Sequence, residues 1–342
     1  MKRSIIAVIA LVALAISAFA EGNKESPAAG TSAVKSGPQN LMVYTSMKEV
    51  LIGQLKDAYV KKHPNVKVDY YSAGAGKIMA KLAAERQSGQ VVADILWTSE
   101  VPDFFAMKKE NMLEKYVSAE AAKTSSPVND PDGYFTAARL GTLGIVYNTN
   151  LIKTPPTAWN DLLKPEYKGA FAIANPALSG TAFVSVGMLV ENFGWEFIQK
   201  LRANGAMMGQ GSGQVVDDTA IGSLAACIGV DYITLDKVEK GSPLGFFNPP
   251  EMLVIPSPAA IIKGTRNLDA AQKFIDFILS VEGQTIIAEA NTISVRSDVK
   301  ARTEMGLVTA GEAVKRALKV DYDKLGTNKE ATLERFTNIM TK

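Results

Sequence analysis

The chain has little of two residue types on which much protein chemistry depends. Its 342 residues include one cysteine and one histidine. A single cysteine excludes an internal disulfide, and Cys227 stands in an apolar run that is typical of a small buried side chain. His63 stands in Lys-Lys-His-Pro, the pattern of an exposed turn at a helix end. The shortage of histidine argues against a Ser-His-Asp hydrolase.

The chain also lacks an excess of charge of either sign. It has 37 Lys and Arg residues against 35 Asp and Glu residues, and it contains no basic block. Such a balance gives no attraction to nucleic acid or to a membrane surface, so we expect neither as a partner. No group of residues has the spacing of a zinc site. The sequence therefore predicts no cofactor.

The first residues have the pattern of a secretion signal. Met1-Lys2-Arg3 is positive, residues 4–15 are almost wholly apolar, and Ala18-Phe19-Ala20 has the small-x-small pattern of a cleavage site. We expect residues 1–20 to be a cleavable signal peptide and the mature protein to be periplasmic. The alternative, an N-terminal membrane anchor, is disfavoured because the apolar run is short for a membrane span. Residues 21–40, rich in Ser, Gly, Pro and Ala, predict a flexible linker.

From residue 41 onward, strand patterns alternate with helix patterns. This alternation predicts an α/β fold in which mostly parallel sheets are flanked by helices. Two further short apolar runs, 252–255 and 259–262, are predicted as edge strands that return to the first half of the chain. The other predicted strands are 41–44, 66–71, 93–97, 144–147, 170–173 and 225–232, and the predicted helices are 48–62, 78–85, 101–111, 182–192, 195–203, 215–224, 268–279 and 282–290, followed by a helical tail from residue 309.

The strongest candidate for ligand binding is Ser179-Gly180-Thr181, which follows the strand 170–173 and opens an apolar helix. A helix start presents unpaired backbone N–H groups, and here two hydroxyls stand beside them. Such a group of donors suits an anion. The alternative is an ordinary helix N-cap. We favour ligand contact, because open parallel sheets bind ligands beyond the carboxyl ends of their strands.

Other polar or small residues follow predicted strands at the same edge. The 72–77 loop, Ser-Ala-Gly-Ala-Gly-Lys, resembles a phosphate-binding nest but lacks the spacing of a P-loop, and a tight turn is the alternative. Thr45 and Ser46 follow the first strand, and capping of the next helix explains these hydroxyl residues as well as ligand contact does. The candidates from these loops are Thr45, Ser46, Ser72, Gly74, Gly76 and Thr98.

Three later residues complete the candidate site. Asp218 lies in the first turn of the helix 215–224, where the helix dipole alone can explain a carboxylate. It could also accept hydrogen bonds from ligand hydroxyls or pair with an amine. Asp231 and Tyr232 end the strand 225–232.

Several segments, in their number and order, resemble one family, the periplasmic solute-binding proteins of ABC importers. The resemblance is to the branch for ferric ion, organophosphonates, sugar phosphates and thiamine, and it covers nearly all of residues 41–342. The segments are Val43-Tyr-Thr-Ser-Met-Lys48, Gly141-Thr-Leu-Gly-Ile-Val-Tyr-Asn-Thr149, Pro156-Thr-Ala-Trp-Asn-Asp-Leu-Leu163, Tyr167 to Thr181, Gly229-Val-Asp-Tyr232, Ile261 to Ser280, Val281-Glu-Gly-Gln284 and Val320-Asp-Tyr322.

The resemblance implies a type II periplasmic-binding fold, with two α/β lobes joined by hinge strands that close on a ligand. Lobe 1 would comprise residues 41–140 and 254–299, lobe 2 residues 141–253, and residues 300–342 a C-terminal helical segment. It also implies a monomer that is not an enzyme and that delivers its solute to a membrane permease and an ATPase. The leading hypothesis is a phosphorylated sugar or an organophosphonate as the solute.

The alternative within this family is ferric iron, held by Tyr232 and another tyrosine such as Tyr147. Two departures from the ferric-binding pattern argue against it. Met47 stands where the resembling ferric-binding members carry a histidine, and Ile233 follows Tyr232 where they carry a second adjacent tyrosine. A secreted phosphatase or lyase is a third hypothesis, disfavoured because no catalytic set is visible.

Overall fold

The computed structural model describes residues 39–125 and 129–342. The predicted signal peptide, 1–20, and residues 21–38 of the predicted linker lie outside the described residues. Among the helices that are described, none has the combination of length and apolar character required to cross a bilayer.

The described strands form one sheet, in the order β2-β1-β3-β10-β5-β8-β6-β7, with β4 paired to β10 and β9 paired to β5. Their bounds are β1 Gln39–Thr45, β2 Val66–Ser72, β3 Ile95–Trp97, β4 Leu113–Glu114, β5 Thr136–Asn148, β6 Phe171–Ala174, β7 Met207–Gly209, β8 Ala226–Val230, β9 Leu244–Phe247 and β10 Leu253–Ile262.

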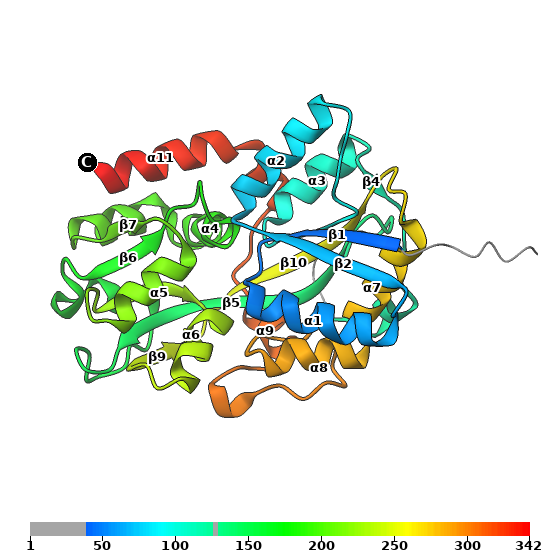
Figure 1. Ribbon diagram of the computed structural model, residues 1–342. Coiled ribbons are helices and arrows are strands. Elements are labelled where there is room, and N and C mark those ends of the chain that lie inside the picture. The colour runs from blue at the N-terminus through cyan, green and yellow to red at the C-terminus, as the bar shows by residue number, and fades with distance from the viewer. Residues whose placement is uncertain (1–38, 126–128) are drawn as a thin grey trace, which may run out of the picture. The chain divides into compact units, whose positions relative to one another are not determined.

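The sheet contains two groups of parallel strands joined through an antiparallel centre. In the first group β1 pairs in parallel with β2 and β3, and in the second β6 pairs in parallel with β7 and β8. Between them β5 and β10 are antiparallel to each other, and β5 runs from one group to the other (Figure 1). This arrangement confirms the predicted α/β fold. The two groups of parallel strands form the two ends of the sheet, and the antiparallel strands β5 and β10 lie between them.

The two runs predicted as edge strands, 252–255 and 259–262, form one strand at the centre of the sheet. All ten residues of β10 are buried, and the strand pairs with β3, β4 and β5. The prediction of edges was wrong because the prolines at 256 and 258 disfavour a central strand. The strand accommodates them by a register shift between Pro256 and Pro258.

Helices cover this sheet, and the starts of several of them line the cavity described below. The α-helices are α1 Glu49–Lys62, α2 Ala75–Gln87, α3 Val101–Lys109, α4 Gly180–Ala203, α5 Ser212–Ala220, α6 Asp231–Glu239, α7 Leu268–Leu279, α8 Val281–Glu289, α9 Ala310–Arg316, α10 Tyr322–Thr327 and α11 Lys329–Thr341, and the 3-10 helices are η1 Ala119–Lys123, η2 Trp159–Leu163, η3 Pro165–Tyr167 and η4 Thr303–Met305.

The predicted helices 182–192 and 195–203 agree with the structure, because α4 consists of two helical segments that meet at Gly194, whose φ of 75° interrupts the helical backbone. One boundary differs from the prediction. The strand predicted to end at Tyr232 ends at Val230, and Asp231 begins α6. The apolar residues on both sides of this boundary hide the change of period, so sequence alone placed it two residues late.

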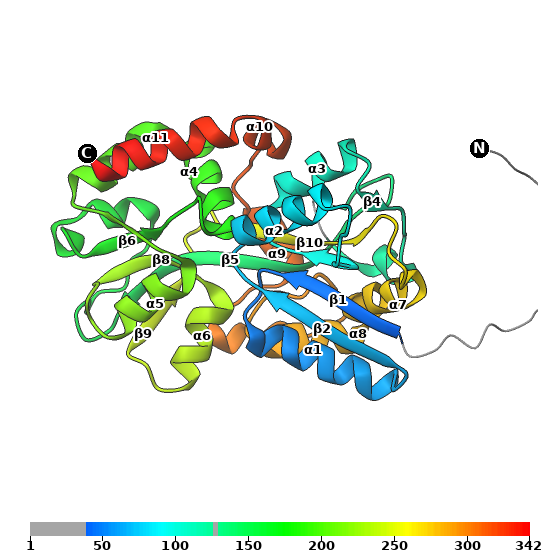
Figure 2. The same cartoon turned by 45° about the horizontal axis from the view of Figure 1, so that its top comes forward.

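Two large hydrophobic clusters correspond to the two groups of strands. One contains side chains of β1, β2, α1 and α7 together with Ala313 of α9. The other contains side chains of β6, β8 and α4 together with Leu325 of α10 and Phe336 of α11. The helix α11 lies beside α4 (Figure 2), and α10 contacts α3. We propose the lobe boundaries given above, with α9 added to lobe 1 and with α10 and α11 added to lobe 2.

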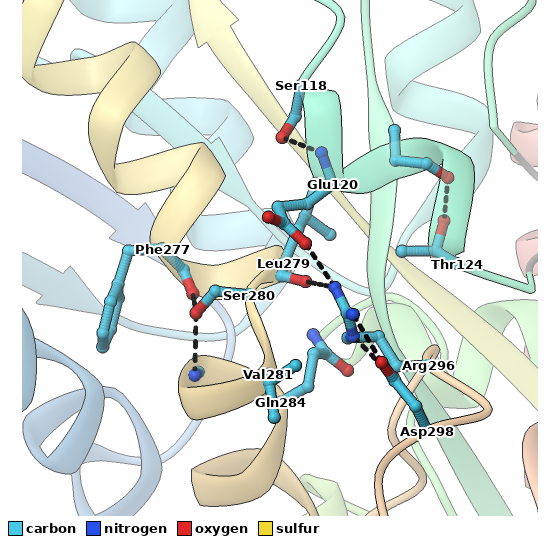
Figure 3. A network of polar contacts seen from close by, with 12 residues as sticks. Ser118, Glu120, Thr124, Phe277, Leu279, Ser280, Val281, Gln284, Arg296 and Asp298 are labelled. Atoms are coloured by element: carbon cyan, nitrogen blue, oxygen red, sulfur yellow. Dashed lines mark hydrogen bonds and ion pairs between the residues drawn. The ribbon is translucent and has the colours of Figure 1, made fainter.

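A buried arginine joins segments of the proposed lobe 1. Arg296 is 2% exposed and donates two hydrogen bonds of 2.7 Å to the carboxylate of Asp298. It also pairs with Glu120 of η1 and donates to the carbonyl of Leu279 at the end of α7 (Figure 3). One side chain therefore joins three segments that are far apart in the sequence.

We expect Arg296→Ala to lower the free energy of unfolding by about 2–3 kcal/mol, because the substitution removes a buried guanidinium together with its charge-assisted hydrogen bonds. Urea unfolding followed by circular dichroism measures the change. Lys273→Ala is the matched control, because its pair with Asp269 is exposed and should contribute less than about 0.5 kcal/mol. Equal effects of the two substitutions would contradict the role of Arg296.

Candidate ligand-binding site

A cavity of about 620 Å³ lies between the two lobes. This volume is within the range of sites for small organic ligands, about 300–1,000 Å³. Lobe 1 contributes the loops after β1, β2 and β3, and lobe 2 contributes the starts of α4, α5 and α6. The polar or charged side chains in the lining are Ser46, Lys48, Tyr71, Ser72, Lys77, Ser99, Arg139, Ser179, Thr181, Gln210, Ser212, Gln214 and Tyr232.

Three hydroxyls converge where α4 and α5 begin. The Oγ of Ser179 lies 2.9 Å from Oγ1 of Thr181 and 2.7 Å from Oγ of Ser212, and the last two atoms are 3.1 Å apart. Ser179 is the N-cap of α4 and Ser212 is the first residue of α5. Helix starts expose N–H groups and carry positive partial charge, so this hydroxyl cluster can hold an anion. Ser212, which the sequence analysis did not include among the candidate ligand-binding residues, belongs to the cluster.

Arg139 of β5 is a residue of the cavity lining that sequence reasoning missed. Its side chain is 2% exposed and lines the cavity. One Nη donates to Oγ1 of Thr292 at 3.1 Å and the other to Oγ of Ser99 at 3.4 Å, while the buried Nε has no hydrogen-bond partner among the described residues. A charged residue within the apolar run 137–147 was the available clue, because arginine is rarely fully buried without a partner.

Tyr232 and Asp231 have different environments although they are adjacent. The ring of Tyr232 lies 5.1 Å from the guanidinium carbon of Arg139, and its hydroxyl accepts a hydrogen bond of 3.1 Å from the N–H of Lys48. Burial raises the pKa of Tyr232, so its hydroxyl is a neutral donor at neutral pH. Asp231 is fully buried outside the cavity lining, and its carboxylate accepts from Thr142 and Thr292.

The charge of the lining is one-sided. Arg139 is buried, whereas Lys48 and Lys77 are exposed at the rim. No carboxylate is present among the described residues that line the cavity. The positive side chains and the hydroxyl cluster together give a site that attracts an anion.

Seven of the predicted site residues line this cavity, and five do not. Those in the lining are Ser46, Ser72, Gly74, Ser179, Gly180, Thr181 and Tyr232. Those outside it are Thr45, Gly76, Thr98, Asp218 and Asp231, and Tyr147 of the alternative iron site is also outside.

The residues outside the lining have local roles. Thr45 is fully buried and accepts a hydrogen bond from the N–H of Met47, and Thr98 is also buried. Asp218 lies near the end of α5, which begins at Ser212, so the prediction that it lies in the first turn of the helix was wrong and the helix dipole does not explain its position. Tyr147 packs against Gly245 of β9. Even within the lining, the Ser72 hydroxyl is engaged, because it donates to the carbonyl of Met47 at 2.6 Å.

Gly74 and Gly76 allow the two lobes to approach closely. A Cβ at Gly74 would lie 2.3 Å from the carbonyl oxygen of Leu178, and one at Gly76 would lie 2.8 Å from that of Ala177. Gly180 of the other lobe also allows a close approach, since a Cβ added there would lie 2.9 Å from Cβ of Glu100. The 72–77 loop, which resembles a phosphate-binding nest in sequence, therefore forms a close contact with residues 177–178 of the other lobe.

Glu100 of lobe 1 is a buried carboxyl behind the start of α4. Burial and the neighbouring carboxyl of Asp103 raise the pKa of Glu100 to about 7, and the opposing effect of Lys329 is smaller. The ammonium of Lys329, from α11, pairs with Glu100 and lies 3.2 Å from Asp103. The charge of Glu100 thus changes near neutral pH, beside the hydroxyl cluster.

Comparisons with known proteins identify the family and the fold of the chain. Residues 91–309 match the family described as "Bacterial extracellular solute-binding protein". The chain therefore belongs to this family, which confirms the resemblance noted from its motifs. It is 26% identical to a Salmonella typhimurium protein named "Putative 2-aminoethylphosphonate-binding periplasmic protein", over 83% of this chain and 86% of the relative.

Two solved structures show the same two-lobed fold. The periplasmic binding protein AfuA from Actinobacillus pleuropneumoniae, with fructose 6-phosphate bound, is 23% identical with a TM-score of 0.74, over 89% of this chain and 99% of AfuA. Iron-bound HitA from Pseudomonas aeruginosa is 21% identical with a TM-score of 0.74, over 88% of this chain and 99% of HitA. Identities at this level support the fold and leave the ligand open.

We expect Gly74→Ala to weaken ligand binding about five- to a hundredfold, because an added methyl group against a backbone carbonyl costs about 1–3 kcal/mol and the lobes must separate to accommodate it. The melting temperature of the unliganded protein should change little, since each lobe keeps its own core. Isothermal titration calorimetry measures the affinity. Gly311→Ala in α9, where a Cβ would meet nothing within 4 Å, is the control. Undiminished affinity in Gly74→Ala would overturn the close-approach role.

Ligand affinity should also depend on the charge of Glu100. The carboxyl is protonated below its pKa of about 7 and negative above it, so it opposes an anion at the start of α4 only at the higher pH. We expect the ratio of the wild-type dissociation constant to that of Glu100→Gln to rise about threefold or more between pH 6 and pH 8. Taking the ratio cancels the ionisation of the ligand itself. A ratio independent of pH would argue against this coupling.

Proposed function

We propose that this protein is the extracytoplasmic binding component of an ABC importer for a small solute that carries a phosphonate or phosphate-ester group. The solute would bind in the cavity between the lobes and then pass to a membrane permease coupled to an ATPase. One observation carries the proposal. Three hydroxyls and two helix starts converge in a cavity whose described lining contains three cations and no carboxylate.

The chemistry of the hydroxyl cluster suits capture followed by release. Hydroxyl and backbone N–H groups can donate several hydrogen bonds to a phosphonate dianion without forming a locked ion pair. The phosphonate would replace the mutual contacts of Ser179, Thr181 and Ser212 with bonds to its own oxygens. We propose these three residues and Gly180 as the anion seat, with Ser46 and Ser72 on the opposite side of the cavity.

The family and the relative support transport rather than catalysis. The family consists of solute-binding proteins, and the Salmonella typhimurium relative is named for a phosphonate and for the periplasm. We propose the same compartment for this chain, reached by the predicted signal peptide, and a monomeric state. Its function would be binding without turnover.

Ferric iron is the second candidate, because the iron-bound HitA shares the fold. Iron(III) prefers several anionic oxygen ligands. In this cavity Tyr232 is a phenol beneath the guanidinium of Arg139, and Tyr147 lies outside the lining. No group of three or more His, Cys, Asp or Glu side chains that could hold a metal ion occurs within residues 39–125 and 129–342. These features favour an anion over a trivalent cation.

A thermal-shift screen of protein beginning at Glu21 tests the proposal. The panel is propylphosphonate, 2-aminoethylphosphonate, 3-phosphonopropionate, fructose 6-phosphate and iron(III) citrate. A ligand at a hundred times its dissociation constant stabilises the protein by about 2.7 kcal/mol, which raises the melting temperature by a few degrees. We expect shifts with phosphonates or phosphate esters. A shift and a phenolate-to-iron colour with iron(III) citrate alone would overturn the proposal.

Thr181→Val should weaken the best phosphonate or phosphate ester about five- to a hundredfold, because a buried anionic oxygen then loses a donor worth about 1–3 kcal/mol. Titration calorimetry measures the loss. Thr285→Val is the matched control, since that hydroxyl bonds within α8 and lies outside the cavity. Unchanged affinity in Thr181→Val would remove Thr181 from the anion seat.

A further inference from the structure

We propose that the solute carries a second acidic group, such as a carboxylate, at the end opposite its phosphonate or phosphate ester, and that Arg139 binds this group. The inference rests on the proposed function and narrows its substrate class. It also predicts that this chain differs in preference from a binding protein for an aminoalkylphosphonate, whose distal group is a cation.

The first support is the bonding of Arg139. Its two Nη atoms donate only to the neutral hydroxyls of Ser99 and Thr292, and no carboxylate among the described residues forms an ion pair with it. The nearest acidic influence is Asp231, which lies behind Thr292 and accepts a hydrogen bond of 3.1 Å from the Thr292 hydroxyl. Arg139 is only 2% exposed, its Nε has no hydrogen-bond partner among the described residues, and no carboxylate contacts it as a counter-ion.

The second support is that Arg139 and the hydroxyl cluster are separate parts of one lining. Arg139 contacts Ser99, Thr292 and the ring of Tyr232, whereas the cluster residues hydrogen-bond to one another. The two groups come from different elements, β5 on one side and the starts of α4 and α5 on the other. A single phosphonate group would leave most of a 620 Å³ cavity unfilled.

The third support is the absence of a partner for an ammonium. The described lining has no carboxylate. Glu100 lies behind Gly180 and is paired with Lys329, and Asp217 is paired with Lys237 outside this cavity. A ligand ammonium near Arg139 would meet a buried positive charge, whereas a carboxylate there would gain charge-assisted hydrogen bonds.

Three phosphonates with the same two-carbon spacer isolate the distal group. Propylphosphonate ends in a methyl group, 2-aminoethylphosphonate in an ammonium and 3-phosphonopropionate in a carboxylate. We expect 3-phosphonopropionate to bind the wild-type protein about ten- to a hundredfold more tightly than propylphosphonate, and 2-aminoethylphosphonate to bind most weakly. Titration calorimetry at fixed pH and salt gives the three dissociation constants.

The variant Arg139→Gln assigns the preference to its residue. We expect the affinity ratio of 3-phosphonopropionate to propylphosphonate to fall toward one in this variant. Lys273→Gln is the control, because Lys273 is an exposed cation outside the cavity lining, and it should keep the wild-type ratio. A ratio that falls equally in both variants would overturn the role of Arg139.

The outcomes separate this inference from the proposed function. If none of the three phosphonates and no phosphate ester binds, the proposed function fails. If the three phosphonates bind with equal affinity, or if 2-aminoethylphosphonate binds most tightly, the second acidic group is refuted while the phosphonate seat stands. The wild-type comparison remains decisive even if Arg139→Gln does not fold.

Discussion

The antiparallel pairing of β5 with β10 is the constraint on which the site depends. Both strands are buried almost along their full length, and β5 pairs with β10 through one half and with β8 and β9 through the other. A slip of one residue would turn every side chain of β5 to the opposite face. The register therefore decides that Arg139 reaches the cavity and that Thr142 meets Asp231 behind it. The same strand, β5, therefore connects the two lobes and carries Arg139, the buried cation of the cavity.

Much of the fold could be predicted from local pattern, and the errors occur where tertiary pairing decides. The bounds predicted for α7, 268–279, agree with the structure because its apolar residues recur with a helical period and the chain breaks on both sides. The strand β10 was divided because prolines weigh heavily in a local pattern, whereas a register shift in the sheet can accommodate them. Secondary structure that depends on partners far away in the sequence is not visible in a window of ten residues.

The candidate site was predictable to a similar degree. Ser179 and Thr181 could be found because a hydroxyl pair at a helix start after a strand is a local feature with a direct physical meaning. Arg139 could not, since its significance comes from Ser99 and Thr292, which are 40 and 153 residues away. The meaning of Gly74 was also hidden. Its loop was interpreted as a phosphate-binding nest, whereas the lack of a side chain at Gly74 leaves space for the carbonyl of Leu178.

One acidic group behind the cavity, Asp231, explains how the buried cation Arg139 can be retained before a ligand arrives. A guanidinium without any compensating charge in the protein interior would destabilise the fold strongly. Asp231 compensates Arg139 in part, but the Thr292 hydroxyl stands between them, so the cation is stabilised without being neutralised by contact. Glu100, behind the start of α4, differs from Asp231, because it pairs with Lys329 and burial raises its pKa to about 7. Asp231 is close enough to Arg139 to stabilise the unliganded protein, but it lies outside the cavity lining and leaves the site free. The positive potential of the cavity therefore remains available to an anion, and the same indirect compensation limits how tightly that anion is held.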